Sequence, residues 1–115
     1  MVIRLVLVVK KIYCSHPFTG NEESNRLDAR NKIAELANKF SDTIFINPLD
    51  ALMYAENAGL DYDACLYQCV ELLYMCDALI LLGDWKNSKG CLEEYKRASL
   101  KGIPIYNEDL TVLEF

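Results

Sequence analysis

The stretch Asp77-Ala78-Leu79-Ile80-Leu81-Leu82-Gly83 decides the fold class of this chain. Residues 78–82 are all apolar, without polar alternation, which is typical of a strand covered on both faces of a parallel sheet. Gly83 and Asp84 follow with residues that favour a turn. The stretch therefore predicts a central buried strand that opens into a loop, with Asp77 as a structural residue at its entrance.

Helical patterns lie on both sides of this strand. Before it, residues 61–76 carry an apolar stripe at i, i+4, i+7, i+8 and i+11, formed by Cys65, Cys69, Leu72, Leu73 and Cys76. The stripe predicts a helix whose three cysteines pack in the core. After the strand, Asn87 or Ser88 is a candidate N-cap for a helix over 89–101, which Gly102 ends. A further strand is expected at 103–106.

The N-terminal half has the same order of strand, loop and helix. The expected elements are a buried strand at 2–14, a helix at 22–39, a short strand at 43–46 and a weak helix at about 49–57. The tail, 110–115, can add an edge strand. Alternating strands and helices predict an α/β fold, a single-domain flavodoxin-like or Rossmann-like three-layer sandwich with a four- to five-stranded parallel sheet.

Length and composition limit the function classes. The 115 residues correspond to one domain over 1–115, with 52% hydrophobic and 25% charged residues, as in ordinary globular proteins. A net charge of −5 argues against general binding of nucleic acid or anionic membrane. Five cysteines without a CxxC pair favour the reducing cytoplasm, and the apolar opening segment is too short to span a bilayer. We therefore expect a cytoplasmic protein with a small-molecule partner.

Ligands of open parallel sheets bind at the carboxyl ends of the strands, so three loops are candidates: 15–21, 47–50 and 83–90. The first and third loops open helices, whose free N–H groups suit phosphate. The candidate substrate- and phosphate-binding residues are Ser15, His16, Thr19, Gly20, Asn47, Trp85, Ser88 and Gly90. The alternative is that these loops are only caps and turns, because no Walker or GxGxxG pattern is present.

Glu94 lies within two helical turns of Ser88 and Gly90. A carboxylate in a cleft beside phosphate donors suits glycosyl chemistry, in which it attacks or stabilises an oxocarbenium-like carbon. The alternative is a solvated glutamate paired with Arg97 or Lys101.

His16 and Trp85 are two further candidates whose roles the sequence leaves open. His16 is the only histidine, so we expect it near the pocket but in no metal site, because one histidine cannot build such a site alone. Trp85 can stack on a base, line an interface or simply pack. No metal or organic cofactor is implied.

Four segments resemble a known family: KIYCSHPFTG (11–20, with Asn25), INP (46–48), CDALILLGDW (76–85) and SKGCLEEY (88–95, with Ala98). They are similar to a small uncharacterised family, often phage-borne, that is related to the nucleoside 2-deoxyribosyltransferases and the deoxynucleoside 5′-phosphate N-hydrolases. The resemblance runs from about Lys11 to Tyr106 and implies a flavodoxin-like sheet. It also implies a homodimer in which the partner chain helps to close the site.

The resemblance implies roles for individual residues. Glu94, four residues after Gly90 and four before Ala98, takes the position of the nucleophile that attacks the N-glycosidic bond. Ser88 matches the serine of the phosphate-preferring hydrolases, and Tyr13 matches an aromatic residue that borders the sugar.

One position departs from the family pattern. Cys69 stands where relatives carry an acidic residue that protonates the leaving base. Either Asp61, Asp63 or His16 takes that role, or the activity is slow or absent. With Glu94 in the position of the nucleophile, the first hypothesis is a nucleotide N-glycosidase or deoxyribosyltransferase-like enzyme.

Two alternatives stay open beside that enzyme. The first is a non-catalytic module on the same fold that senses or sequesters a nucleotide. The second is a structural or interaction protein in which Glu94 is a surface residue.

Overall fold

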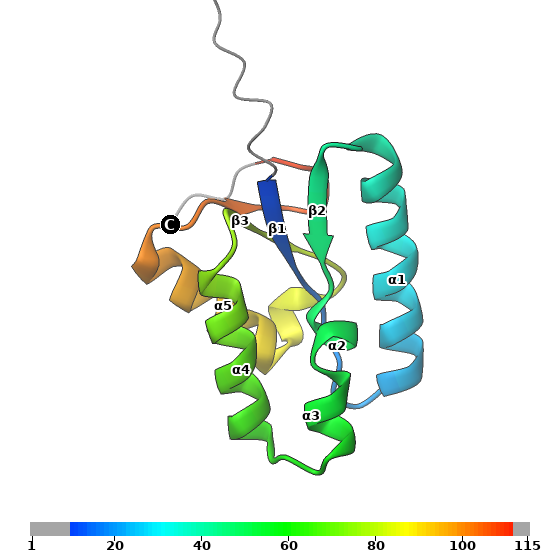
Figure 1. Ribbon diagram of the computed structural model, residues 1–115, viewed down its shortest axis with the longest axis vertical. Coiled ribbons are helices and arrows are strands. Elements are labelled where there is room, and N and C mark those ends of the chain that lie inside the picture. Colours follow the sequence, from blue (N-terminus) through cyan, green and yellow to red (C-terminus); the bar gives the residue numbers. More distant parts are fainter. Residues whose placement is uncertain (1–9, 112–115) are drawn as a thin grey trace, which may run out of the picture.

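The computed structural model describes residues 10–111 and contains one four-stranded sheet in that part of the chain. All pairings are parallel, in the order β2-β1-β3-β4 (Figure 1). The strands are β1 (Lys10–Ser15), β2 (Thr43–Ile46), β3 (Ala78–Leu81) and β4 (Ile105–Tyr106). Because the chain passes from β2 back across β1 to β3, the strand order reverses between β1 and β3. The predicted fold class is confirmed.

The helices cover the two faces of the sheet unequally. They are α1 (Glu22–Lys39), α2 (Pro48–Ala51), α3 (Met53–Asn57), α4 (Tyr62–Tyr74) and α5 (Lys89–Lys101), with a 3₁₀ turn, η1, at Trp85–Asn87. Helix α1 packs on one face, where Ala29 and Ile33 contact Cys14 and Ile80. Helices α4 and α5 pack on the other face, over a core that includes Tyr13. The three layers follow from the alternation of side chains along each strand.

Polar residues at the predicted boundaries start the helices. Asn47, Asp61 and Ser88 accept hydrogen bonds from the N–H groups of Leu49, Ala64 and Cys91, at 3.1, 2.8 and 3.2 Å. These side chains satisfy N–H groups that the first helical turn leaves unpaired. The sequence therefore fixes where α2, α4 and α5 begin.

Three predicted elements differ from the structure. The strand expected at 2–14 is described as Lys10–Ser15, and residues 2–9 lie outside the described residues. The helix expected at 49–57 is two short helices, α2 and α3, separated at Leu52. The edge strand expected at 110–115 is not found at Leu110 and Thr111, where the chain turns back so that the N–H of Asn107 donates to the carbonyl of Thr111. Residues 112–115 lie outside the described residues.

The prediction that three cysteines of the helix at 61–76 pack in the core is confirmed for Cys76, which follows α4, and for Cys69, which packs against the core, and it is wrong for Cys65. Cys76 is buried, but Cys65 and Cys69 are only half-buried and line a cavity. The reason is that the N-terminal half of α4 extends past the carboxyl ends of the strands (Figure 1). Its apolar stripe therefore lines the cavity at Cys65, and at Cys69 it reaches both the cavity and the core.

Candidate active site

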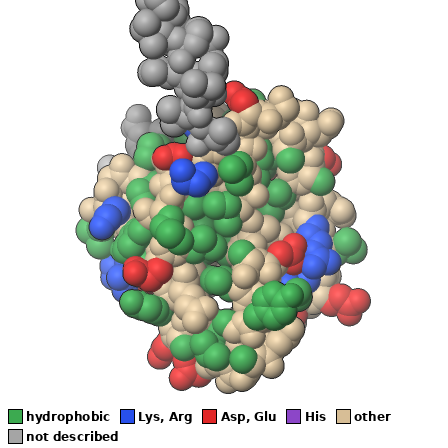
Figure 2. Space-filling model, viewed as in Figure 1, with side chains coloured by type: hydrophobic (Ala, Val, Ile, Leu, Met, Phe, Trp, Pro, Cys, Tyr) green, Lys and Arg blue, Asp and Glu red, His purple; other side chains and the backbone are tan. Residues whose placement is uncertain are grey.

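A cavity of about 560 Å³ lies at the carboxyl edge of the sheet, beside the point where the strand order reverses. Its walls come from the loop after β1, the start of α2, the N-terminal half of α4 and the first turns of α5. The surface is hollowed in this region, between hydrophobic side chains (Figure 2). A volume of this size suits a ligand of nucleotide dimensions.

Glu94 of α5 lies at the base of this cavity and is only 6% exposed. The Ser15 hydroxyl donates a hydrogen bond to Oε1 of Glu94 at 2.6 Å, and the Tyr13 hydroxyl donates to Oε2. The solvated alternative for Glu94 is wrong, because Arg97 bonds the neighbouring Glu93 instead, at 2.7 Å. Two hydroxyl donors thus hold one buried carboxylate in a fixed position.

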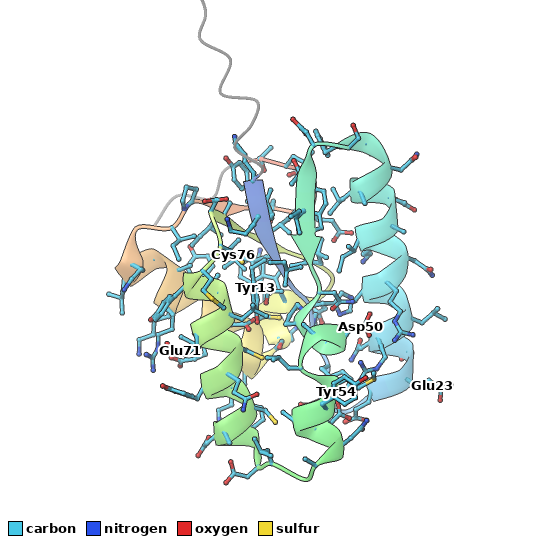
Figure 3. All side chains as sticks on the ribbon, viewed as in Figure 1. Tyr13, Glu23, Asp50, Tyr54, Glu71 and Cys76 are labelled. Carbon is cyan, nitrogen blue, oxygen red and sulfur yellow. The ribbon has the colours of Figure 1, made fainter. Side chains whose placement is uncertain are left out.

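The pairing of Glu94 with β1 follows from strand geometry. Tyr13 and Ser15 are two residues apart, so both point to the face that α4 and α5 cover, while Cys14 points to α1. Tyr13 lies in the centre of the molecule, between β1 and these helices, whereas Glu71 points outward from α4 (Figure 3). The end of β1 therefore supplies both partners of the carboxylate.

Burial dominates the electrostatics of this cluster. It raises the pKa of Glu94 to about 7, against the hydrogen bonds from Ser15 and Tyr13, which lower it. Burial, and next the charge of Glu94, raise the pKa of Tyr13 well above its usual value. Tyr13 therefore remains a protonated donor at neutral pH, while Glu94 exchanges a proton close to pH 7.

His16 borders the cavity with both ring nitrogens engaged. Nδ1 lies 2.7 Å from the carbonyl oxygen of Pro17, and Nε2 lies 2.7 Å from Oδ2 of Asp28. The ring also lies against Gly83, where a Cβ atom would come within 3.0 Å of Nε2. Gly83 adopts a φ of 62°, so it serves both the close approach and the turn after β3.

One comparison with known proteins identifies the family. A model of a domain of unknown function, DUF4406, matches residues 10–107, which include the whole described sheet and the cavity. The chain belongs to the DUF4406 family. No curated protein and no solved structure matches it. Because DUF4406 is uncharacterised, the relation to nucleoside 2-deoxyribosyltransferases stays a prediction.

The DUF4406 domain brings some of the predicted residues together and leaves others apart. His16, Thr19, Ser88, Gly90 and Glu94 line the cavity. Ser15, which we expected to bind phosphate, is fully buried and donates to Glu94 instead. From this position Ser15 can orient the Glu94 carboxylate but not bind a phosphate in the cavity.

Three predicted site residues of the DUF4406 domain are engaged outside the cavity. Gly20 donates its N–H to Glu22, and Asn47 caps α2. Trp85 stacks on Tyr95 with ring centroids 5.7 Å apart and an interplanar angle of 9°. These contacts match the packing alternative for Trp85.

Sequence patterns did not reveal the wall that α4 contributes to the cavity of this DUF4406 domain. Tyr62, Cys65, Leu66 and Cys69 form it, and Nζ of Lys89 lies 5.3 Å from the centre of the Tyr62 ring. The i, i+4 spacing of these residues is the same signal that core residues give. A cavity wall differs from a core helix in one respect: the helix begins beyond the ends of the strands, so its first turns have no sheet to cover.

Two features are not found in the described part of the chain. Within residues 10–111, no cluster of histidine, cysteine and acidic side chains has the arrangement that a metal ion needs. In the same part of the chain, no helix combines the length and the apolar composition that crossing a membrane requires.

Proposed function

We propose that this DUF4406 domain is a nucleotide N-glycosidase or deoxyribosyltransferase-like enzyme that acts on the N-glycosidic bond of a 5′-phosphorylated nucleoside. The observation that carries this proposal is the buried Glu94 carboxylate, held by Ser15 and Tyr13 at the base of a nucleotide-sized cavity. A surface carboxylate would need neither the burial nor the two donors.

Glu94 is the proposed nucleophile. Its ionised carboxylate attacks the anomeric carbon of the sugar, and the bond from that carbon to the base breaks. The product is a glycosyl ester of Glu94, which water hydrolyses or a second base accepts. Ser15 and Tyr13 orient the carboxylate, and Tyr13 borders the site from the strand side.

The start of α5 is the proposed contact for the 5′-phosphate. Ser88, Lys89 and Gly90 line the cavity there, and the first turn of the helix carries no acidic residue. Backbone N–H groups and the helix dipole favour an anion at such a terminus. Thr19 lines the cavity from the loop after β1 and offers a further hydroxyl.

The wall formed by α4 and α2 is the proposed contact for the base. Tyr62 and Leu66 line the cavity from α4, and Pro48 and Leu49 line it from α2. Flat heterocycles pack well against such apolar and aromatic side chains. The homodimer that the family resemblance implies belongs to the same proposal, and light scattering on the purified protein tests it.

The deciding experiment is base release from a panel of ribo- and deoxyribonucleoside 5′-monophosphates with neutral and with cationic heterocycles, followed by chromatography. We expect release by the wild type and by Glu93→Gln, and a loss of at least about 10³-fold in Glu94→Gln. Equal release by Glu94→Gln rules out this nucleophile.

Thermal shift with the same panel separates catalysis from binding. A ligand at 100 times its dissociation constant stabilises the protein by about 2.7 kcal/mol. Stabilisation without any released base supports the nucleotide-binding module instead of the enzyme. A panel that gives neither result contradicts both functions.

A further inference from the structure

Three polar side chains at the end of β1 and in the loop after it, Tyr13, Ser15 and His16, direct their hydrogens away from a bound ligand. Ser15 and Tyr13 each donate to an oxygen of the Glu94 carboxylate. Both nitrogens of His16 face oxygen atoms, on Pro17 and on Asp28. None of these groups is placed to give a proton to a base that leaves through the cavity.

The rest of the described lining contains no second carboxylic acid. Glu94 is the only carboxylate among the residues of 10–111 that line the cavity. Asp61 and Asp63 lie outside the lining, and Asp61 caps α4 by accepting from the N–H of Ala64 at 2.8 Å. Burial raises the pKa of the Cys69 thiol to about 12, and that of Cys91 to about 11. These thiols hold their protons too tightly to replace a carboxylic acid. The same is true of the Tyr62 phenol in the lining, because burial, and next the charge of Glu94, raise its pKa.

We propose that the cavity takes a nucleotide whose heterocycle is already cationic at the glycosidic nitrogen, as in a pyridinium nucleotide. This inference rests on the proposed function of Glu94 and adds the class of leaving group to it. A neutral purine or pyrimidine leaves as an anion unless an acid protonates it, and such assistance contributes about 10²- to 10⁴-fold. A pyridinium ring leaves as a neutral molecule and needs no proton.

The reaction balances without any further reactant except water. Glu94 forms a C–O bond to the anomeric carbon while the C–N bond breaks and its electron pair passes to the ring nitrogen, which becomes neutral. Water then cleaves the glycosyl ester, which returns the Glu94 carboxylate and releases the sugar phosphate and one proton to solvent. No acid enters the first step, and the second step needs only removal of a proton from water.

The change of charge during the reaction suits the same class of substrate. In the first step a carboxylate and a cationic ring become an ester and a neutral heterocycle, so two charges disappear. A step that neutralises two opposite charges has a lower activation free energy between apolar walls than in water, because the reacting groups have less solvation to lose before the transition state. Leu66 and Tyr62 supply such walls beside the buried carboxylate of Glu94.

The test compares substrates that differ in the charge of the leaving group. The probes are nicotinamide mononucleotide, its reduced dihydropyridine form, which has the same framework without the positive charge, and adenosine 5′-monophosphate. Each rate is divided by the uncatalysed rate of the same compound. We expect a kcat/KM ratio of at least about 10²-fold in favour of the pyridinium over both neutral substrates.

A second arm supplies the missing acid. Cys69 lies on α4 beside the Tyr13 hydroxyl and within electrostatic reach of Glu94. We expect Cys69→Asp to raise the ratio of neutral to pyridinium cleavage by about 10-fold or more, and the size-matched Cys69→Ser to keep the wild-type ratio. If Cys69→Asp does not fold, the wild-type comparison between oxidised and reduced substrate decides alone.

The outcomes separate this inference from the proposed function. Cleavage of the neutral substrates as fast as the pyridinium overturns the leaving-group inference but leaves Glu94 as the nucleophile. A folded Cys69→Asp variant that keeps the wild-type ratio also overturns it. Cleavage of none of the substrates overturns the proposed function itself.

Discussion

Glu93 and Glu94 are neighbours on α5, yet the structure gives them opposite surroundings. Glu93 lies on the outer side and accepts a hydrogen bond from Arg97 at 2.7 Å, which lowers the pKa of its carboxyl. Glu94 lies on the inner side, where burial raises its pKa to about 7. One step along a helix turns the side chain by about 100°, which is enough to move it from solvent to the cavity.

The comparison shows how position gives the same group different chemistry. The ion pair keeps Glu93 charged and bound to Arg97, so it is a structural residue on the surface. Glu94 has two hydroxyl donors but, among the described residues, no ion pair with a cationic side chain, so its negative charge is stabilised only in part. An incompletely compensated carboxylate close to its pKa is the better nucleophile for a cationic substrate.

The largest expected effect is that of Glu94 on the free energy of unfolding. Its pH dependence has the opposite sign from that of an ordinary acidic residue, whose pKa is lowered by folding. Because the folded-state pKa of Glu94, about 7, lies above the ordinary 4.5, its stabilising contribution is complete below pH 4.5 and is lost as pH rises to about 7. At pH 8 the buried charge therefore costs up to about 3 kcal/mol. We expect Glu94→Gln to stabilise the protein at pH 8 by up to this amount, and to have much less effect at pH 5.

Urea unfolding of wild type, Glu94→Gln and Glu93→Gln at both pH values checks this prediction. Glu93→Gln is the matched control, since it removes the same charge one residue away on the same helix. A destabilised Glu94→Gln at pH 8 would show that the two hydroxyls fully compensate the carboxylate.

The second expected effect is on the pH dependence of cleavage. Only ionised Glu94 attacks, so kcat/KM should rise with pH through a midpoint near 7 and reach a plateau above it. Two pH units below the midpoint, at pH 5, we expect about a 100-fold lower value. Initial rates across pH 4.5–9 measure it, and Glu93→Gln should leave the midpoint where it is. A midpoint near the ordinary glutamate pKa of 4.5 would contradict the burial argument.

The third effect concerns the donors that distinguish the two glutamates. Ser15→Ala removes the hydrogen bond to Oε1 of Glu94, and a bond to a charged group contributes about 2 kcal/mol. We expect a loss of about this size in unfolding free energy at pH 8 and a smaller loss at pH 5. The pH midpoint of cleavage should move upward, because this bond lowers the pKa of Glu94.

Ser24→Ala is the control for Ser15→Ala, since Ser24 is exposed and donates only to the carbonyl of Asn21. It should change neither stability nor the midpoint measurably. A Ser15→Ala variant that loses equal stability at pH 5 and pH 8 would mean that Ser15 supports packing and not the charge.

The fold could be predicted because its signals are local. The apolar run at 78–82 and the helical stripe at 61–76 each determine an element without reference to the rest of the chain. Capping residues such as Ser88 mark boundaries for the same reason. The start of β4, expected at 103 and found at Ile105, and the tail could not be predicted, because edge pairing depends on neighbours far away in the sequence.

The candidate site could be predicted only in part. Glu94 was one of two alternatives, since helical periodicity does not say which side of α5 meets the sheet. The hydroxyls of Tyr13 and Ser15, two residues apart at the end of an apolar strand, are a signal that was available and was not used. The contact between His16 and Asp28 joins a loop to a helix and has no sequence pattern of its own.

The smallest expected effect lies on the outer side of α5. Arg97→Ala breaks the ion pair with Glu93, whose two groups are four residues apart on the outer face of the helix. Such pairs contribute little in water because solvent and salt screen them. Exposed i, i+4 pairs contribute only a few tenths of a kcal/mol. We therefore expect no resolvable change in melting temperature, at low salt or at about 0.5 M salt, and an unchanged pH midpoint of cleavage. A clear, salt-dependent loss would show that the ion pair on the outer side of α5 stabilises the helix.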